Sequence, residues 1–193
     1  MPARKLVYIF IFILSTSLSS QAQTSLGFSA GINIPTANAY FRDNYNVSFN
    51  AGMHHEWVLA KPTSMGWEFT FASYTPKYEK LDPVQTGGFL AYLKLQDNTM
   101  RADEFQIFVK GGAGLGFAAD GKPGGHPSFP PFAIALVSGA GANYILPDRH
   151  KIFLETDYRQ YIGGKQGYYH GVFLNAGFSF DLQKLNESNK PAY

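Results

Sequence analysis

Strict alternation between apolar and small or polar residues is the feature that most constrains the fold of this 193-residue chain. In the segment 26–34, Leu26, Phe28, Ile32 and Ile34 take alternate positions, with Gly27 between the first two and Asn33 between the last two. A period of two is typical of a β-strand whose two faces meet different surroundings, because successive side chains point to opposite sides. The pattern recurs in eight segments: 26–34, 47–59, 65–72, 89–96, 105–117, 132–146, 152–159 and 172–182. Eight strands of this length are typical of a small β-barrel.

The segments between the expected strands alternate in length. Four are longer and three are shorter: 35–46, 75–87, 118–131 and 163–170 against 60–64, 97–103 and 147–150. This alternation is expected of an up-and-down barrel with tight turns at one end and larger loops at the other. No stretch reaches 18 consecutive apolar residues, which argues against a transmembrane helix. We therefore predict an all-β fold, an eight-stranded antiparallel up-and-down transmembrane β-barrel over residues 23–182, with a polar tail over 183–193.

The first 22 residues have the three parts of a secretory signal peptide. Arg4 and Lys5 form a positive start, an apolar run covers 6–14, and small residues precede an expected cleavage after Ala22. These two basic residues belong to the total of 16, so the rest of the chain carries 14 basic and 14 acidic residues. This balance, without any block of Lys or Arg, argues against a nucleic-acid partner. The absence of cysteine excludes a disulfide scaffold and a thiolate metal site.

The composition of the two faces indicates which side of the barrel meets lipid. Charged residues make up only 16% of the chain, against roughly 25% in an ordinary soluble domain. The apolar face is continuous over the eight segments, whereas Gly, Ser, Asn and Thr dominate the other face, as suits a narrow interior. The charges on that second face are expected to pair inside the barrel, since buried charges need partners. These residues are Glu56, Glu68, Lys94, Lys110, Glu155, Asp157, Arg159 and Asp181.

Large aromatic residues of the apolar face gather toward the expected tight turns. They are Trp57, Trp67, Phe105, Tyr144 and Phe180. A ring of such residues at one level is typical of a membrane interface, where an amphipathic ring meets both lipid and water. Aromatic side chains are equally good core material. A soluble lipocalin-like carrier, with this face turned inward around a ligand, therefore remains the alternative.

Four short motifs make the chain resemble a known family. They are Gly31-Ile-Asn-Ile-Pro35, Phe108-Val-Lys-Gly-Gly-Ala-Gly114, Gly139-Ala-Gly-Ala-Asn-Tyr-Ile-Leu146 and Leu154-Glu-Thr-Asp-Tyr-Arg159. With these motifs the chain is similar to the outer-membrane β-barrel proteins of the Bacteroidetes-type porin family, which are related in architecture to the small OmpA- and OmpX-like barrels. The resemblance implies residence in the cell outer membrane and names no activity. The chain departs from this family in the tail that follows Phe180, where such barrels often end.

The histidine and serine pattern does not favour a catalytic or metal site. His126 and Ser128 have the His-x-Ser spacing of outer-membrane lipid A deacylases, with Glu155 as a conceivable orienting acid, but they lie in a Gly/Pro-rich segment and Glu155 belongs to the other face. His54 and His55 are adjacent in an expected strand and point to opposite faces, so they cannot chelate one ion. We expect no enzymatic activity, cofactor or metal, and the deacylase stays a less favoured alternative.

The expected function is therefore structural or interactive. An eight-stranded barrel has an interior just wide enough for side chains to fill it. The partners expected are outer-membrane lipid and a possible extracellular ligand or surface partner that meets the longer loops, and the protein is expected to be a monomer. Seven aromatic residues in those loops are the candidate contacts: Tyr40, Phe41, Tyr45, Tyr78, Phe129, Tyr168 and Tyr169.

Overall fold

The computed structural model describes residues 24–36, 39–60, 62–97, 104–120, 132–162 and 168–182. The expected signal peptide, residues 1–22, and the expected tail, residues 183–193, lie outside this part of the chain. In the described residues no helix has the length and the apolar character needed to cross a membrane.

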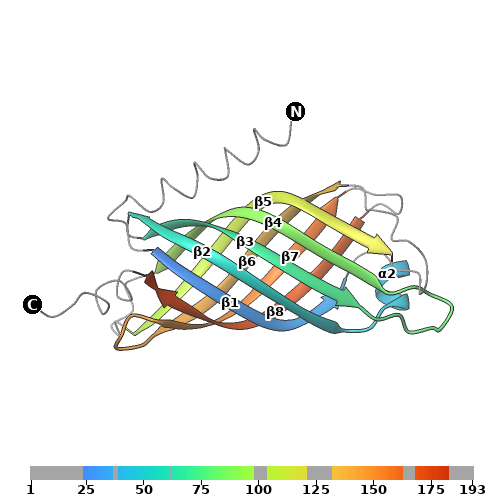
Figure 1. The fold of residues 1–193 in the computed structure, drawn as a ribbon, viewed down its shortest axis with the longest axis horizontal. Coiled ribbons are helices and arrows are strands. Elements are labelled where there is room, and N and C mark those ends of the chain that lie inside the picture. The colour runs from blue at the N-terminus through green and yellow to red at the C-terminus, as the bar shows by residue number, and fades with distance from the viewer. Residues whose placement is uncertain are drawn as a thin grey trace, which may run out of the picture.

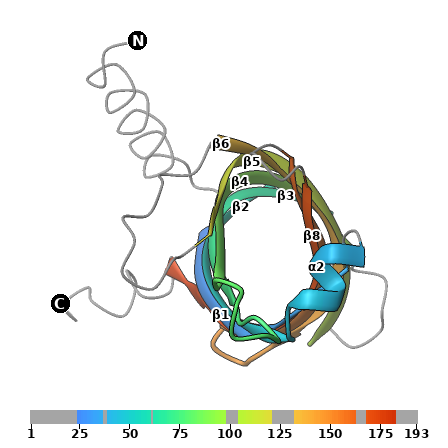
Figure 2. The same ribbon diagram turned by 90° about the vertical axis from the view of Figure 1, so that its right-hand side faces the viewer.

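Eight antiparallel strands form one closed barrel. They are β1 (Thr24–Pro35), β2 (Ser48–Ala60), β3 (Thr63–Tyr74), β4 (Val84–Asp97), β5 (Phe105–Asp120), β6 (Phe132–Ile145), β7 (Lys151–Ile162) and β8 (Tyr168–Asp181). Each strand pairs with its neighbour in the sequence, and β8 closes the barrel against β1 (Figures 1 and 2). The predicted eight-stranded up-and-down barrel is thus confirmed.

Several strands extend beyond their predicted ends. β4 begins at Val84 and β5 continues to Asp120, so residues assigned to the longer loops belong to the barrel wall. β8 begins at Tyr168, which places His170 in a strand and not in a loop. The alternation is weak in these places, because 84–88 holds two adjacent glycines, 118–119 two adjacent alanines and 168–169 two adjacent tyrosines.

The apolar face of the sheet lies outside. Phe49 is 80% exposed and Leu154 is 63% exposed, whereas the residues between such positions point into the barrel and are mostly buried. A lipocalin-like carrier would need the apolar face inside, around a ligand cavity. The structure has the opposite arrangement and so contradicts that alternative.

The β6–β7 turn shows how the short connections are built. Leu146 N donates to His150 O at 2.8 Å, and Arg149 N donates to Leu146 O at 2.8 Å. Arg149 has a φ of 66°, the left-handed conformation that closes such a turn. The backbone NH of His150 donates to Asp148 Oδ1, and this side-chain contact further fixes the loop.

One short helix, α2 (Ala39–Asn44), lies at the opposite end of the barrel. It follows β1 and sits at the mouth where the longer connections meet, as the view from that end shows (Figure 2). The pattern of the sequence did not predict this helix, because six residues are too few to show a helical period.

Candidate functional site: the lumen and its mouth

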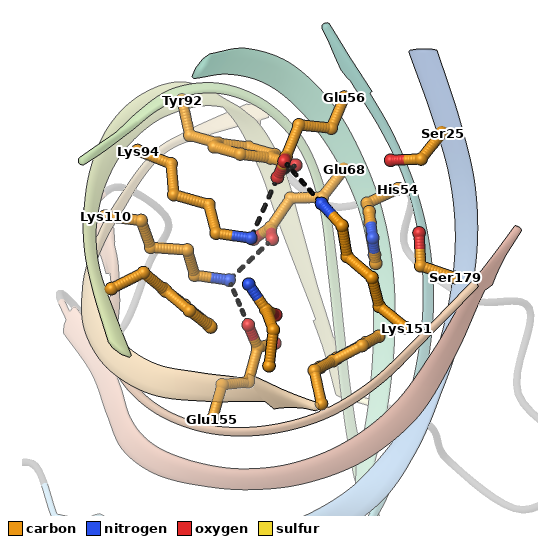
Figure 3. Close-up of a pocket in the computed structure, with 13 residues that line it drawn as sticks. Ser25, His54, Glu56, Glu68, Tyr92, Lys94, Lys110, Lys151, Glu155 and Ser179 are labelled. Atoms are coloured by element: carbon orange, nitrogen blue, oxygen red, sulfur yellow. Dashed lines mark hydrogen bonds and ion pairs between the residues drawn. The ribbon is translucent and has the colours of Figure 1, made fainter. Parts of the chain in front are cut away.

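The charged layer nearest the tight turns is centred on Glu56 of β2. Its carboxylate accepts a hydrogen bond from Lys94 Nζ at 2.9 Å, and Lys151 Nζ lies 3.8 Å from its other oxygen. Tyr92 donates to the same carboxylate, at 3.5 Å. Glu56 is only 3% exposed, so these contacts supply the counter-charge that a buried carboxylate requires. Figure 3 shows the three charged side chains converging from different strands.

Lys110 of β5 forms the next layer. Its ammonium group contacts three carboxylates: Glu68 at 3.0 Å, Glu155 at 3.0 Å and Asp157 at 3.1 Å. Asn175 also donates to Glu155, at 3.2 Å. One cation therefore joins three strands across the interior, since β3, β5 and β7 each contribute a partner (Figure 3).

Arg159 of β7 closes the network toward the mouth. Its guanidinium contacts Asp157 at 2.6 Å and Glu68 at 3.0 Å, and it donates to Thr70 Oγ1 at 2.7 Å. It also lies over the ring of Phe173, 4.9 Å from the centroid. The charge is thus paired on one side and packed against an aromatic face on the other.

All seven residues predicted as a lumen charge network lie inside the barrel in these layers: Glu56, Glu68, Lys94, Lys110, Glu155, Asp157 and Arg159. Asp181, the eighth charge assigned to this face, is also buried. The prediction missed Lys151, which stands at the first position of β7, before the alternation is established. Its inward parity with Glu155 is the signal that would have found it.

Aromatic side chains fill the space around these charges. Lys94 Nζ lies 4.0 Å from the centroid of Phe108, and the absence of a side chain at Gly66 leaves room for Tyr92, whose hydroxyl would lie 2.7 Å from a Cβ at that position. A cavity between them has a volume of about 20 Å³ and is lined by Ser25, His54 and Ser179 among others. A cavity of this size holds about one water molecule. The charged and aromatic side chains around this cavity therefore leave room for little more than one water molecule.

An aromatic cluster occupies the mouth at the other end. The ring of Phe41 in α2 lies 4.8 Å from that of Tyr74, 5.0 Å from that of Tyr45 and 5.1 Å from that of Tyr169. All four residues are buried. We call them the mouth cluster.

The mouth cluster corrects part of the predicted contact surface. Phe41, Tyr45 and Tyr169 were expected to be exposed in loops, and they are buried because the rings pack against one another within the barrel rim. Tyr78 is 59% exposed, in keeping with a surface position. Phe129 and the side chains of Tyr40 and Tyr168 lie outside the described part of the structure.

The five aromatics predicted for a membrane interface all point outward, but they do not share one level. Trp57, Phe105, Tyr144 and Phe180 lie near the strand ends at the tight-turn side. Trp67 pairs with His55, whereas Trp57 pairs with Met65, so Trp67 lies two positions further from the β2–β3 turn. The His55 ring lies between them, 4.4 Å from Trp57 and 6.0 Å from Trp67.

The residues weighed for a hydrolase do not form a site in the described structure. His126 and Ser128 lie outside the described residues. Glu155 points into the lumen, where it contacts Lys110. His54 points inward and His55 outward, as their adjacent positions predict, and His170 lies outside, 2.8 Å from the Tyr158 hydroxyl through its Nδ1. Among the described residues, no three His, Asp or Glu side chains are placed to hold a metal ion.

Comparison with known proteins gives the fold and no family. No protein-family model matches the chain, and no curated protein matches it. The crystal structure of Neisserial surface protein A (NspA) is similar, with a TM-score of 0.70 at 13% identity over 84% of this chain and 99% of that chain. Ail, the attachment invasion locus protein of Yersinia pestis, gives a TM-score of 0.51 at 13% identity over 83% of this chain and 100% of that chain. The chain shares the fold of these small eight-stranded barrels.

Proposed function

We propose that this protein is a non-enzymatic integral outer-membrane β-barrel that acts as a monomer and presents its longer connections outside the cell. The observation that carries the proposal is the pairing of an apolar outer face with a lumen filled by ion pairs and aromatic rings. An apolar outer face over all eight strands is stable in lipid and would promote aggregation in water. A filled lumen favours a scaffold or interaction role over solute transport.

The leader and the short motifs support the location. A signal peptide ending at Ala22 would direct the chain out of the cytoplasm, and the resemblance to the Bacteroidetes-type porin family favours the outer membrane as its destination. In this orientation β1 begins and β8 ends on the periplasmic side, with α2 and the mouth cluster outside. A monomer is favoured because the ion pairs and the mouth cluster are complete within one chain.

Single cysteines test both the location and the orientation, since the natural chain contains none. Glu79→Cys places a thiol on the exposed β3–β4 connection, and Asp148→Cys places one in the β6–β7 turn. In intact cells that have an outer membrane, a membrane-impermeant maleimide is expected to label Glu79→Cys and to label Asp148→Cys only after the membrane is permeabilised. Labelling of both variants in intact cells, or the reverse pattern, would contradict the proposal.

A further inference from the structure

The helix α2 and the β3–β4 connection form one unit over the mouth, which we call the lid and define as residues 39–46 and 75–82. Asn46 N donates to Thr75 O at 2.9 Å, and Lys77 N donates to Asn44 O at 2.8 Å. Lys77 Nζ also donates to Arg42 O at 3.0 Å. These bonds join two segments that lie far apart in the sequence into one unit.

The lid contributes two buried rings, Phe41 and Tyr45, and Phe41 packs directly on the strands. Phe41 is 2% exposed, and its ring packs on Tyr74 of β3 and Tyr169 of β8. Removal of this ring would leave a cup with aromatic walls. Arg159 lies below it, with its charge already paired to Asp157 and Glu68.

Two buried amides lie near the mouth ends of the neighbouring strands β1 and β2, and some of their polar atoms have no partner. Asn50 pairs in register with Ala72, two residues below Tyr74, and Asn33 pairs with Phe173. Within the described residues, Asn33 Nδ2, Asn33 Oδ1 and Asn50 Nδ2 form no hydrogen bond, although Asn33 is fully buried and Asn50 is 6% exposed. Buried amides are costly to leave unpaired, so these atoms point to a polar partner that the closed barrel does not supply.

We propose that the mouth is a binding site for a neutral sugar ring, and that Phe41 occupies this site when the lid is closed. Aromatic walls offer flat apolar surfaces to the faces of such a ring, and each amide offers both donors and an acceptor to its hydroxyl groups. Arg159, the cation below the cup, is already paired with two carboxylates, so it offers little attraction to an anion. A purely apolar ligand would leave the amides unpaired. This inference rests on the proposed function, because the mouth must face the exterior.

Closure by Phe41 predicts that the natural protein binds weakly. The apparent affinity falls by the fraction of molecules whose site is open, so a variant without the ring should gain affinity. The test uses refolded protein, residues 23–193, with glucose, galactose and N-acetylglucosamine as probes and calorimetry as the readout. Phe41→Ala is expected to bind at least one of these sugars roughly ten-fold or more tightly than the natural chain.

Matched variants locate the site. In the Phe41→Ala background, Asn33→Leu with Asn50→Leu is expected to abolish that gain. Asn143→Leu removes another buried inward amide, near the tight turns, and is expected to leave binding unchanged. If Phe41→Ala does not refold, Phe41→Leu replaces it, with a smaller gain expected.

Three results would overturn the proposal. The first is that the refolded Phe41 variant binds no sugar. The second is that the variant with Asn33 and Asn50 also replaced binds sugar as tightly as Phe41→Ala alone. The third is that Phe41→Ala binds cyclohexanol or glucuronate as tightly as the neutral sugar. Gel mobility with and without boiling is measured for every sample. A sample that keeps the heat-dependent shift but binds no sugar disproves the binding site, whereas a sample without the shift has lost the barrel. The same sugar is offered free and at the end of an immobilised glycan. Binding of either form supports the site, and the form that binds more tightly shows whether the ligand is a free sugar or a glycan end.

Discussion

Lys110 is the residue on which the charge balance of the lumen depends most. Its one ammonium group faces Glu68, Glu155 and Asp157, each within about 3 Å. The side chain is almost fully buried, so solvent cannot replace it. Loss of this cation would leave Arg159 as the cation in contact with Glu68 and Asp157, and would leave Glu155 with the Asn175 amide.

Lys110→Met is therefore expected to destabilise the barrel by about 3–5 kcal/mol, the usual result of removing one partner from a buried ion pair. Urea unfolding of the refolded protein in lipid vesicles measures the change. Lys80→Met, at an exposed position of the β3–β4 connection, serves as the control and should alter stability by less than about 0.5 kcal/mol. Equal effects of the two substitutions would mean that the lumen network does not stabilise the fold.

At Arg149 a substitution is expected to increase the stability of the protein. This residue holds a φ of 66°, which costs a residue with a side chain roughly 1 kcal/mol or more relative to glycine. Arg149→Gly is expected to raise the free energy of unfolding by about 0.5–1 kcal/mol, after the greater flexibility of glycine in the unfolded chain is taken into account. The same urea titration measures it, and a loss of stability would argue against this turn conformation.

At the scale of the strand, the outward face is what separates a membrane barrel from a soluble one. Leu174 lies near the middle of β8 and points outward, whereas Phe180 lies one residue from its end. Leu174→Arg is expected to cost about 2–4 kcal/mol in a bilayer, and Phe180→Arg about 1 kcal/mol or less, because a charge near the interface can reach water. Both are measured by unfolding from vesicles. A Leu174→Arg variant as stable as the natural chain would place this face in water.

The strands were predictable because each carries a two-residue period, and parity then decides which side chains share the interior. Glu155, Asp157 and Arg159 could be grouped in this way before any contact was known. Which charges pair across the barrel, such as Lys110 with Glu155, depends on how far β5 and β7 are shifted along each other. The sequence of a single strand does not reveal this shift. Lys151, which contacts Glu56 of β2, was missed for another reason: it stands at the first position of β7, before the alternation is established.

The mouth was much less predictable. Phe41 and Tyr45 lie in a connection without any period, so their residue type indicated only an aromatic loop. Their burial depends on hydrogen bonds between two connections, such as that from the Tyr45 hydroxyl to Asp82 O at 3.1 Å. A long-range contact of this kind leaves no local signal in the sequence.

At the scale of the whole molecule, the layers of the lumen predict an electrically silent protein. Ion pairs fill the half near the tight turns, and the mouth cluster closes the other end. Refolded protein added to a planar lipid bilayer is expected to give no step-like currents, while a porin measured in the same bilayer does. Reproducible unitary steps from the purified chain would show that the lumen conducts.

The central claim is that one closed barrel turns its apolar face to lipid, and gel mobility with and without boiling tests it most directly. Residues 23–193 are refolded in detergent and, in parallel, in buffer alone. We expect a heat-dependent shift in detergent, since a closed barrel resists unfolding until it is boiled, and aggregation without detergent. A monomer that stays soluble without detergent and migrates equally before and after boiling would contradict the account.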